Sequence, residues 1–310
     1  MSALLCGSMA YDTIMAFHDR FKNHILPDKV HMLNISFLVP ELRREYGGCA
    51  GNIAYNLNLL GETAMPMATV GEDFGPYAAW MDRCGISRRY IKVVERTYTA
   101  QAFITTDQDD NQITAFHPGA MSFSHYNRAD EVEGIRIAIV SPDGREGMIE
   151  HARQLASANI PFVFDPGQGM PMFDGADLLS FLDLATWATF NDYEAALLRD
   201  RTGKSLYQLA ERVEGLVVTR GGQGSSLYLR DRCIEIPVAP ARTIADPTGC
   251  GDAFRAGFLY GLLGGLDLEN AARIGAVMGA IKVEHKGTQN HNVTLDEIRD
   301  RFREAFGYGF

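Results

Sequence analysis

Short apolar runs alternate with helical stretches over most of the chain. Runs typical of buried strands occur at residues 3–6, 135–140, 161–165, 188–191 and 215–219. Apolar positions with helical spacing occur at residues 53–60, 147–156, 194–198, 252–263 and 268–283. Strands and helices in this alternation predict right-handed β-α-β units, and therefore an α/β fold with a mostly parallel sheet flanked by helices.

A second pattern interrupts the first near the N-terminus. Residues 99–105 alternate between polar and apolar, a polar turn follows at 107–111, and a further β-like stretch covers 112–116, which is typical of a β-hairpin. The irregular, polar region from Asp12 to Glu45 contains another β-like run at residues 34–39. We expect these segments to form a small separate sheet, a lid made of approximately residues 13–45 and 96–118, on a single domain spanning 1–310.

Composition and charge narrow the class of protein. Apolar residues make up 46% of the chain and charged residues 22%, which is ordinary for a globular protein. The formal net charge of −10 argues against a main role on nucleic acid or an anionic membrane. The five cysteines include no CxxC pair, and no apolar run is long enough to span a membrane. We expect a soluble cytoplasmic protein with small-molecule partners, and neither a nucleic-acid nor a membrane partner.

The most informative segment is Asp246-Pro-Thr-Gly-Cys-Gly-Asp252, which leads directly into the predicted helix at 252–263. Gly249 and Gly251 allow backbone N–H groups to converge, and the helix adds its positive N-terminal end, so the segment is suited to hold an anion. Beside that anion, Asp252 is placed to accept a proton from an attacking hydroxyl. An ordinary Asp helix cap in a glycine-rich turn explains the residues equally well.

This segment resembles the DTxGxGD signature of the ribokinase-like, or PfkB, family of sugar and nucleoside kinases, with Pro247 in place of the usual small residue. Further segments resemble motifs of the same family and occur in the family's order: Gly47-Gly-x-x-x-Asn52, Asn191-Asp-Tyr-Glu194 and Thr219-Arg-Gly-Gly-Gln-Gly224. The resemblance implies a Rossmann-like α/β domain with a small β lid and an ATP-dependent phosphotransferase. The sequence contains neither a P-loop motif nor a dinucleotide-binding GxGxxG after a strand, which would indicate other nucleotide-binding families.

Within that family, further segments are most similar to bacterial adenosine kinases. They are residues 7–12, 33–52, 111–122 and 190–194, together with the Asp252 segment. The implied reaction is ATP-dependent phosphorylation of the 5′-hydroxyl of adenosine, giving AMP and ADP, as in purine salvage. A kinase of the same family that acts on another nucleoside or a free sugar is one alternative, and a nucleoside sensor without turnover is another. The sequence does not choose between a monomer and a homodimer.

The resemblance assigns residues to the reaction and to the nucleoside. Asp252 is implied as the base, and the amides of Gly249, Cys250 and Gly251 as the anion hole. Residues implied to contact the nucleoside are Asp12, Gly48 and Asn52 at the ribose, Phe103 and Phe116 stacked on the purine, and Ser8, Ser36 and Gln168 as weaker polar contacts. Several have plainer interpretations: Asp12 as a solvated loop residue, the phenylalanines as hairpin core, and the serines as partners of nearby backbone groups.

The resemblance also assigns residues to ATP and its metal ions. Asn191 and Glu194 are implied to act on Mg²⁺ through water, although acidic residues also favour a helix N-terminus on their own account. Thr219, Arg220, Gly222 and Gly224 would line the triphosphate. Backbone oxygens of Asp246 and Thr248 match positions that bind a monovalent cation such as K⁺ in many relatives. Arg255 is either a stabiliser of transition-state charge or simply solvated.

Overall fold

The computed structural model describes residues 2–25, 34–109 and 111–310. In that part of the chain the strands form a nine-stranded main sheet, ordered β13-β12-β11-β10-β9-β8-β1-β4-β5, and a four-stranded small sheet, ordered β3-β2-β6-β7. The main sheet is parallel from β5 to β11, and only β12 and β13 at one edge are antiparallel. Its strands are β1 (Ser2–Cys6), β4 (Thr63–Val70), β5 (Tyr90–Val93), β8 (Ile135–Val140), β9 (Phe162–Phe164), β10 (Trp187–Asn191), β11 (Gly215–Thr219), β12 (Ser225–Tyr228) and β13 (Cys233–Ile236). The predicted α/β class is confirmed.

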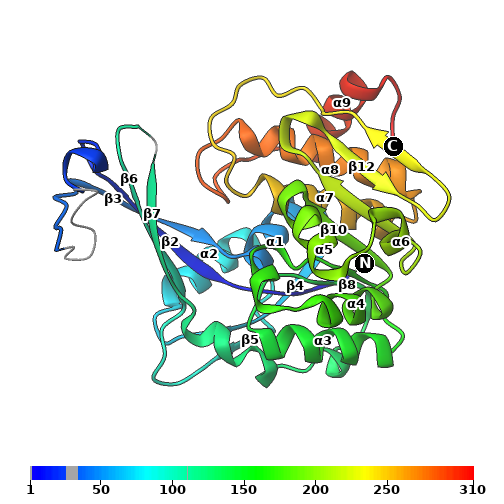
Figure 1. Ribbon diagram of the computed structural model, residues 1–310, viewed down its shortest axis with the longest axis horizontal. Helices are drawn as coiled ribbons and strands as arrows, with labels where there is room; N and C mark the ends of the chain where they lie inside the picture. Colours follow the sequence, from blue (N-terminus) through cyan, green and yellow to red (C-terminus); the bar gives the residue numbers. More distant parts are fainter. Residues whose placement is uncertain (1, 26–33, 110) are drawn as a thin grey trace.

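Helices cover both faces of the main sheet because its strands are apolar on both faces. On β1, Ala3 and Leu5 join one buried cluster, whereas Leu4 and Cys6 join the other. Figure 1 shows α7, α8 and α9 on one side and α3 and α4 on the other. The helices are α1 (Cys49–Leu59), α2 (Gly75–Cys84), α3 (Arg145–Ser157), α4 (Gly175–Leu184), α5 (Asp192–Thr202), α6 (Leu206–Ala210), α7 (Cys250–Leu263), α8 (Leu268–Val283) and α9 (Leu295–Phe306). None of these helices, within the described ranges, is long and apolar enough to cross a membrane.

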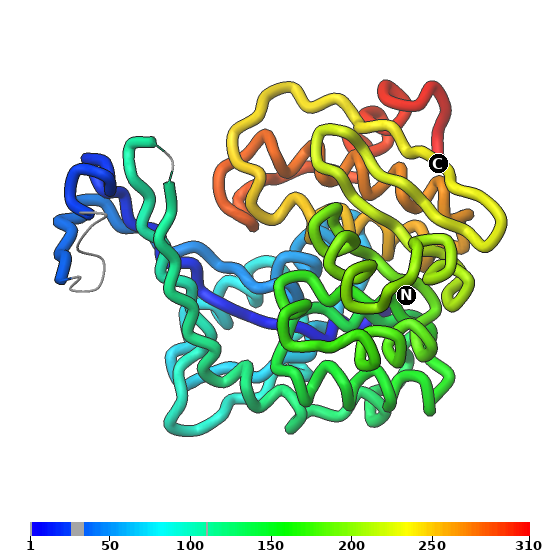
Figure 2. Tube along the Cα trace, in the orientation of Figure 1, coloured from blue at the N-terminus to red at the C-terminus, as the bar shows by residue number. Residues whose placement is uncertain are grey.

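The small sheet projects from the side of the main body (Figure 2). Its strands are β2 (Ala10–Ala16), β3 (Glu41–Gly47), β6 (Ala100–Thr106) and β7 (Gln112–His117). The predicted hairpin is confirmed as β6 and β7, which pair antiparallel. Of the ranges predicted for the lid, residues 26–33 and 110 lie outside the described residues.

The strand predicted at residues 34–39 is wrong. That segment has no regular structure, and the strand begins only at Glu41, on β3. The sequence of β3, ELRREYG, is mostly charged and its first residues are exposed. A charged edge strand is a common protection against unwanted pairing, and it has no apolar alternation to reveal it. The neighbouring strand β2, inside the region interpreted as irregular, was missed as well.

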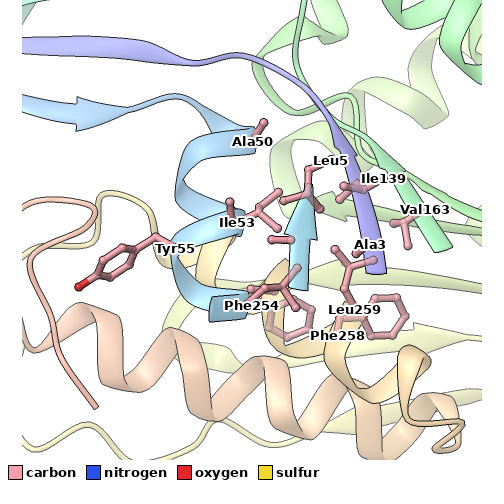
Figure 3. Packing of buried hydrophobic residues seen from close by; sticks show 14 of the residues in the cluster. Ala3, Leu5, Ala50, Ile53, Tyr55, Ile139, Val163, Phe254, Phe258 and Leu259 are labelled. Carbon is pink, nitrogen blue, oxygen red and sulfur yellow. The ribbon is translucent and has the colours of Figure 1, made fainter. Parts of the chain in front are cut away.

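The helices α7 and α8 approach each other closely because glycines face the contact. A Cβ atom on Gly257 would lie 2.7 Å from the backbone nitrogen of Gly275, and one on Gly261 would lie 2.6 Å from the Cα of Ala271. Between α7 and β1, Phe254 and Phe258 fill the core (Figure 3). This packing fixes where the N-terminus of α7 lies.

We expect Gly257→Ala to lower the free energy of unfolding by about 1–3 kcal/mol, because the added methyl group has no space against the α8 backbone. Gly279→Ala, on α8, is the matched control, since its Cβ would lie 3.5 Å from the nearest atom, the Cys250 carbonyl oxygen. That control should be neutral or stabilising by about 0.5–1 kcal/mol. Urea unfolding measures both, and equal effects of the two variants would contradict this account of the packing.

Candidate active site

The N-termini of α1 and α7 meet, although they are far apart in the sequence. Asn52, in the first turn of α1, donates a hydrogen bond of 2.8 Å from Nδ2 to Oδ2 of Asp252, in the first turn of α7. Each helix is preceded by a glycine with positive φ, 84° at Gly48 and 79° at Gly249. A side chain is disfavoured at both positions, because this backbone conformation is readily adopted only by glycine.

The amide of Asn52 is held in one orientation by a neighbouring glutamine. Gln289 donates from Nε2 to Oδ1 of Asn52 at 3.0 Å and to the Tyr77 hydroxyl at 2.7 Å. Its own Oε1 accepts from the indole N–H of Trp80 at 2.8 Å, so the glutamine is fixed in turn. Asn52 must therefore present its N–H₂ group to Asp252. Sequence reasoning missed Gln289, because a glutamine between two predicted elements gives no pattern signal.

Two carboxyl groups of this region have pKa values near neutrality. Burial is the main cause that raises the pKa of Asp252 to about 6, whereas the Asn52 hydrogen bond and the charge of Arg255 act to lower it. Burial also raises the pKa of Asp12 to about 6, and the negative charges of Asp252 and Glu45 add to the effect. Two neighbouring carboxyl groups that resist ionisation are a frequent property of catalytic sites.

Asp12 lies on strand β2 of the small sheet, so it is not the solvated loop residue of the plainer interpretation. A Cβ atom on Gly47 would lie 2.5 Å from its Oδ2 atom, so a side chain at position 47 would displace the carboxylate from its present position. Gly48, implied as a contact to the ribose, packs against the chain itself, because a Cβ there would strike the backbone of residues 8–10, with Ser8 O at 2.5 Å. Ser8 itself accepts from the Cys49 N–H at 3.2 Å, as the interpretation of it as a backbone partner expects.

The turn before α7 offers fewer free amides than the sequence suggested. The Cys250 N–H donates to the Pro247 carbonyl oxygen at 3.1 Å, so it is used within the turn. The N–H groups of Gly249 and Gly251 donate to no group in the described part of the chain. With the positive end of α7 behind them, these two amides can receive an anion beside Asp252. Burial raises the pKa of the Cys250 thiol, which leaves it protonated and a poor nucleophile.

Arg255 is not solvated, so the plainer of its two interpretations is wrong. It is only 7% exposed, and its guanidinium forms a two-point ion pair with Asp165, which is 1% exposed. Its Nη2 also lies 3.9 Å from Oε2 of Glu194. The arginine therefore joins the Asp252 helix to the start of α5. Asp165 was missed, although its place directly after β9, at the carboxyl end of a parallel strand, was the available signal.

Asn191 and Glu194 bond to each other at the start of α5. Asn191 Oδ1 accepts from the Glu194 N–H at 2.7 Å, and Glu194 accepts from the backbone N–H and side-chain Nδ2 of Asn191, both at 2.8 Å. This arrangement is a capping box, which agrees with the alternative that these residues serve the N-terminus of the helix. Across residues 2–25, 34–109 and 111–310, no three His, Cys, Asp or Glu side chains are grouped to hold a metal ion.

The glycine loop after β11 includes 3-10 helix η6 (Gly221–Gln223). Gly224 is required there, because its φ is 81° and a Cβ would lie 2.3 Å from the Ile236 carbonyl oxygen, whereas Gly222 faces open space. Thr219 donates from its hydroxyl to the Phe190 carbonyl oxygen at 3.4 Å. Arg220, predicted as a cation for the triphosphate, forms a partly exposed ion pair with Glu235 on β13.

Phe103 and Phe116 do not flank one space, as their joint assignment to a purine requires. In the β6–β7 register Phe116 is opposite Ala102, and Phe103 is opposite Ala115. Neighbouring positions on a strand project to opposite faces, so the two rings lie on opposite sides of the small sheet. Ala102 also pairs with Asp12 across β2 and β6, which places Asp12, Ala102 and Phe116 on one face. The sequence pattern could not show this, because it depends on the register.

Two weaker candidates lie apart from this cluster. Ser36 is exposed and lies before the outer end of β3, so the structure does not bring it to Asp12 and Asp252. Gln168 is exposed in the 3-10 helix η5 (Gly167–Met172), three residues after Asp165. It lies at the carboxyl end of β9, on the same edge of the main sheet as the Asp165–Arg255 pair.

An α/β fold with a partly buried carboxyl group beside free amides at a helix N-terminus suits an enzyme that transfers a phosphoryl group to a hydroxyl. The family described as pfkB family carbohydrate kinase matches residues 9–295. The chain belongs to this family, and it is a phosphotransferase with an alcohol group as acceptor. The predicted kinase class is confirmed.

Individual relatives match most of this chain, and those with solved structures share its fold. A curated nucleoside kinase from Methanocaldococcus jannaschii is 34% identical over 277 residues, covering 87% of this chain and 90% of the relative. The solved structure of Burkholderia thailandensis nucleoside kinase in complex with inosine is 53% identical, with a TM-score of 0.90 and 99% of each chain covered. The same kinase in complex with ADP-inosine is 55% identical, with a TM-score of 0.88 and 99% and 97% of the two chains covered.

The raised pKa of Asp252 gives a prediction for pH dependence. Because only the carboxylate can accept a proton, kcat/KM should fall as pH drops below about 6. Asn52→Ala removes a hydrogen bond that stabilises the charged form, so the pKa of Asp252 rises and the fall begins at higher pH. A pH–rate profile measures the shift. Asn58→Ala, exposed on the same helix, should leave it unchanged, and an unshifted profile in the Asn52 variant would contradict the assignment.

Proposed function

We propose that the protein transfers the γ-phosphoryl group of ATP to the 5′-hydroxyl of a purine nucleoside, with adenosine as the substrate and AMP and ADP as the products. The observation that carries the proposal is the row formed by Asp12, Ala102 and Phe116 on one face of the small sheet, with the Asp12 carboxyl group close enough to Asp252 for the charge of Asp252 to raise its pKa. Inosine is the second candidate, because a structural neighbour of 53% identity is described in complex with it.

The row matches the parts of a nucleoside. Strands in a sheet are about 4.8 Å apart, so Phe116, two strands from Asp12, is about 10 Å across the sheet. A carboxylate at one end suits the paired hydroxyls of ribose, and an aromatic ring at the other suits a base. Ala102 between them has a small side chain that projects little from this face. Phe116 is 51% exposed, which leaves its ring available for stacking.

In this mechanism Asp252 acts as the base. Its carboxylate accepts the proton of the 5′-hydroxyl as the oxygen attacks the γ-phosphorus in line with the leaving ADP. The Gly249 and Gly251 amides, with the N-terminus of α7, stabilise the negative charge on the transferred group. Asn52 holds the carboxylate in position, since one of its oxygens already accepts from Nδ2. No covalent enzyme intermediate is needed.

The residues at the start of α5 suit a magnesium ion held through water. Both carboxylate oxygens of Glu194 already accept from Asn191, and those of Asp165 accept from Arg255, so contact with the ion through water would leave these hydrogen bonds in place. Mg²⁺ keeps several waters in most protein sites, and it neutralises the charge of the β- and γ-phosphates when bound with ATP. Glu194 and Asn191 would then face that hydration shell. Closure of the small sheet over the nucleoside would exclude water from the reaction.

The substrate test is ADP release from Mg²⁺-ATP by the purified chain with adenosine, inosine, a pyrimidine nucleoside, ribose and a hexose. We expect adenosine to give the highest kcat/KM and ribose to be a poor acceptor, because it lacks the base that Phe116 contacts. A preference for inosine would support the second candidate. Turnover confined to free sugars would contradict the role of Phe116, and nucleoside binding without any turnover would favour a sensor.

Replacing the base tests the mechanism. Asp252→Asn should lower kcat by about 10²–10⁴-fold while nucleoside binding is kept, since the amide keeps the shape but cannot accept the proton. Isothermal titration with adenosine and circular dichroism check binding and fold. Near wild-type turnover in a folded variant would rule out this assignment.

The two lid phenylalanines provide a matched pair. Phe116→Ala should raise the Kd for adenosine about fivefold, which corresponds to about 1 kcal/mol of lost stacking. Phe103→Ala removes the same ring from the opposite face of the small sheet and should leave that Kd unchanged. Equal effects of the two variants, or a larger effect of Phe103→Ala, would show that the face was assigned wrongly.

A further inference from the structure

A buried lysine lies directly behind the turn that precedes α7. Lys282 is in the last turn of α8, in the apolar sequence AVMGAIKV, and is 0% exposed. Its Nζ atom donates to two backbone carbonyl oxygens, Asp246 O and His285 O, each at 3.0 Å. Burying an ammonium group is costly unless it is compensated, so a lysine held by carbonyl oxygens calls for an explanation.

The lysine joins two segments that together support the anion-binding turn. Further hydrogen bonds run between the same segments: Val283 O accepts from the N–H of Asp246 at 3.1 Å, and the Asp246 carboxylate accepts from Gly287 N–H at 2.9 Å. Asp246 also accepts from the Thr248 N–H at 2.9 Å. A Cβ atom on Gly249 would lie 3.2 Å from Thr288, so this glycine packs against the second segment. Displacement of Asp246 would therefore move the amides beside Asp252.

The carbonyl oxygen of Asp246 is one of the two positions that the family resemblance implies as ligands of a monovalent cation. Carbonyl oxygens bind K⁺ by replacing its hydration shell, and an ammonium group satisfies the same oxygens with its N–H donors. In this chain the Lys282 amino group already donates to the Asp246 oxygen at 3.0 Å. A second cation at that oxygen would meet the like charge of Lys282 at short range. The residues present therefore do not fit a bound potassium ion at this position.

We propose that the ammonium group of Lys282 is the built-in cation of this kinase, which holds the Asp246 carbonyl in place of a bound potassium ion. The transfer reaction is then independent of monovalent cations. Lys282 is a positioning residue: it acts on the reacting groups through Asp246 and the turn that follows. The inference depends on the phosphotransferase activity, but not on which nucleoside is the acceptor.

The first arm of the test uses the wild-type chain. Its rate with Mg²⁺-ATP and its accepted substrate is measured in KCl, NaCl and tetramethylammonium chloride at one ionic strength. We expect these rates to agree within about twofold, because no external cation is required. A fall of about tenfold or more when K⁺ is replaced by tetramethylammonium would overturn the proposal.

The second arm removes the charge in two ways. Lys282→Ala leaves a space beside the two carbonyl oxygens, and Lys282→Met fills that space with an uncharged chain of similar length. Both should lose about 10–100-fold in kcat without added K⁺, since a small displacement of the turn has a large effect on transfer. K⁺ or NH₄⁺ should restore the alanine variant alone. The exposed Lys286→Ala, four residues away, is the control and should behave as the wild type.

A third arm measures thermal unfolding without substrate, so that it stands even if the proposed nucleoside is wrong. K⁺ should raise the midpoint of Lys282→Ala but not that of the wild type, because a ligand stabilises only a protein that binds it. A folded alanine variant that is fully active without K⁺, or inactive and not restored by K⁺ or NH₄⁺, would contradict the proposal. If neither Lys282 variant folds, the wild-type arm decides.

Discussion

The hydrogen bond between Asn52 and Asp252 is the contact on which the rest of the site depends. It requires the first turns of α1 and α7 to meet, and therefore requires both helices to lie close against the same face of the main sheet. Glycines on α7 allow the close approach of α8, and Phe254 and Phe258 fix α7 against β1. Gln289 then determines which end of the Asn52 amide faces the carboxylate. The packing of the core therefore also determines how Asn52 and Asp252 are positioned in the site.

The burial that suits Asp252 to its role also opposes folding at neutral pH. Its pKa rises from 3.8 to about 6, so the folded protein holds a proton that the unfolded chain has released between these values. A group of this kind makes the folded state less stable as pH rises from about 4 to 6, and the loss persists above that range. The raised pKa of Asp12 acts in the same direction. Burial of these carboxyl groups therefore lowers the stability of the folded protein at neutral pH, but it also gives Asp252 a pKa that suits a base working near neutrality.

The features that could be predicted from the sequence are those with a local pattern. Buried strands, helices and glycine turns have their own periodicity or residue types, so five strands of the main sheet (β1, β8, β9, β10 and β11) and the Asp252 turn were predicted in the right places, whereas β4, β5, β12 and β13 were missed. The charged strand β3 could not be recognised, because an edge strand needs no apolar alternation. The opposite faces of Phe103 and Phe116 depend on register, which one sequence does not specify.

Contacts between distant segments were the least predictable. Asp165 and Arg255 are 90 positions apart, and only the fold turns a supposedly solvated arginine into half of a buried ion pair. In the sequence, Lys282 resembles an ordinary lysine in the last turn of a helix, a position where a positive charge suits the helix dipole. Only the structure shows that it is buried and that it donates to two carbonyl oxygens. In each case the side chain's neighbours, rather than its residue type, determine what it does.

The most direct test of this account is the titration of the Asp252 carboxyl group by ¹³C NMR of protein labelled at aspartate, with the signal assigned by its absence in Asp252→Asn. We expect a pKa of about 6 for Asp252 in the folded enzyme. A value near 4, the usual range of an exposed aspartate, would show that burial does not raise the pKa of this carboxyl group toward neutrality.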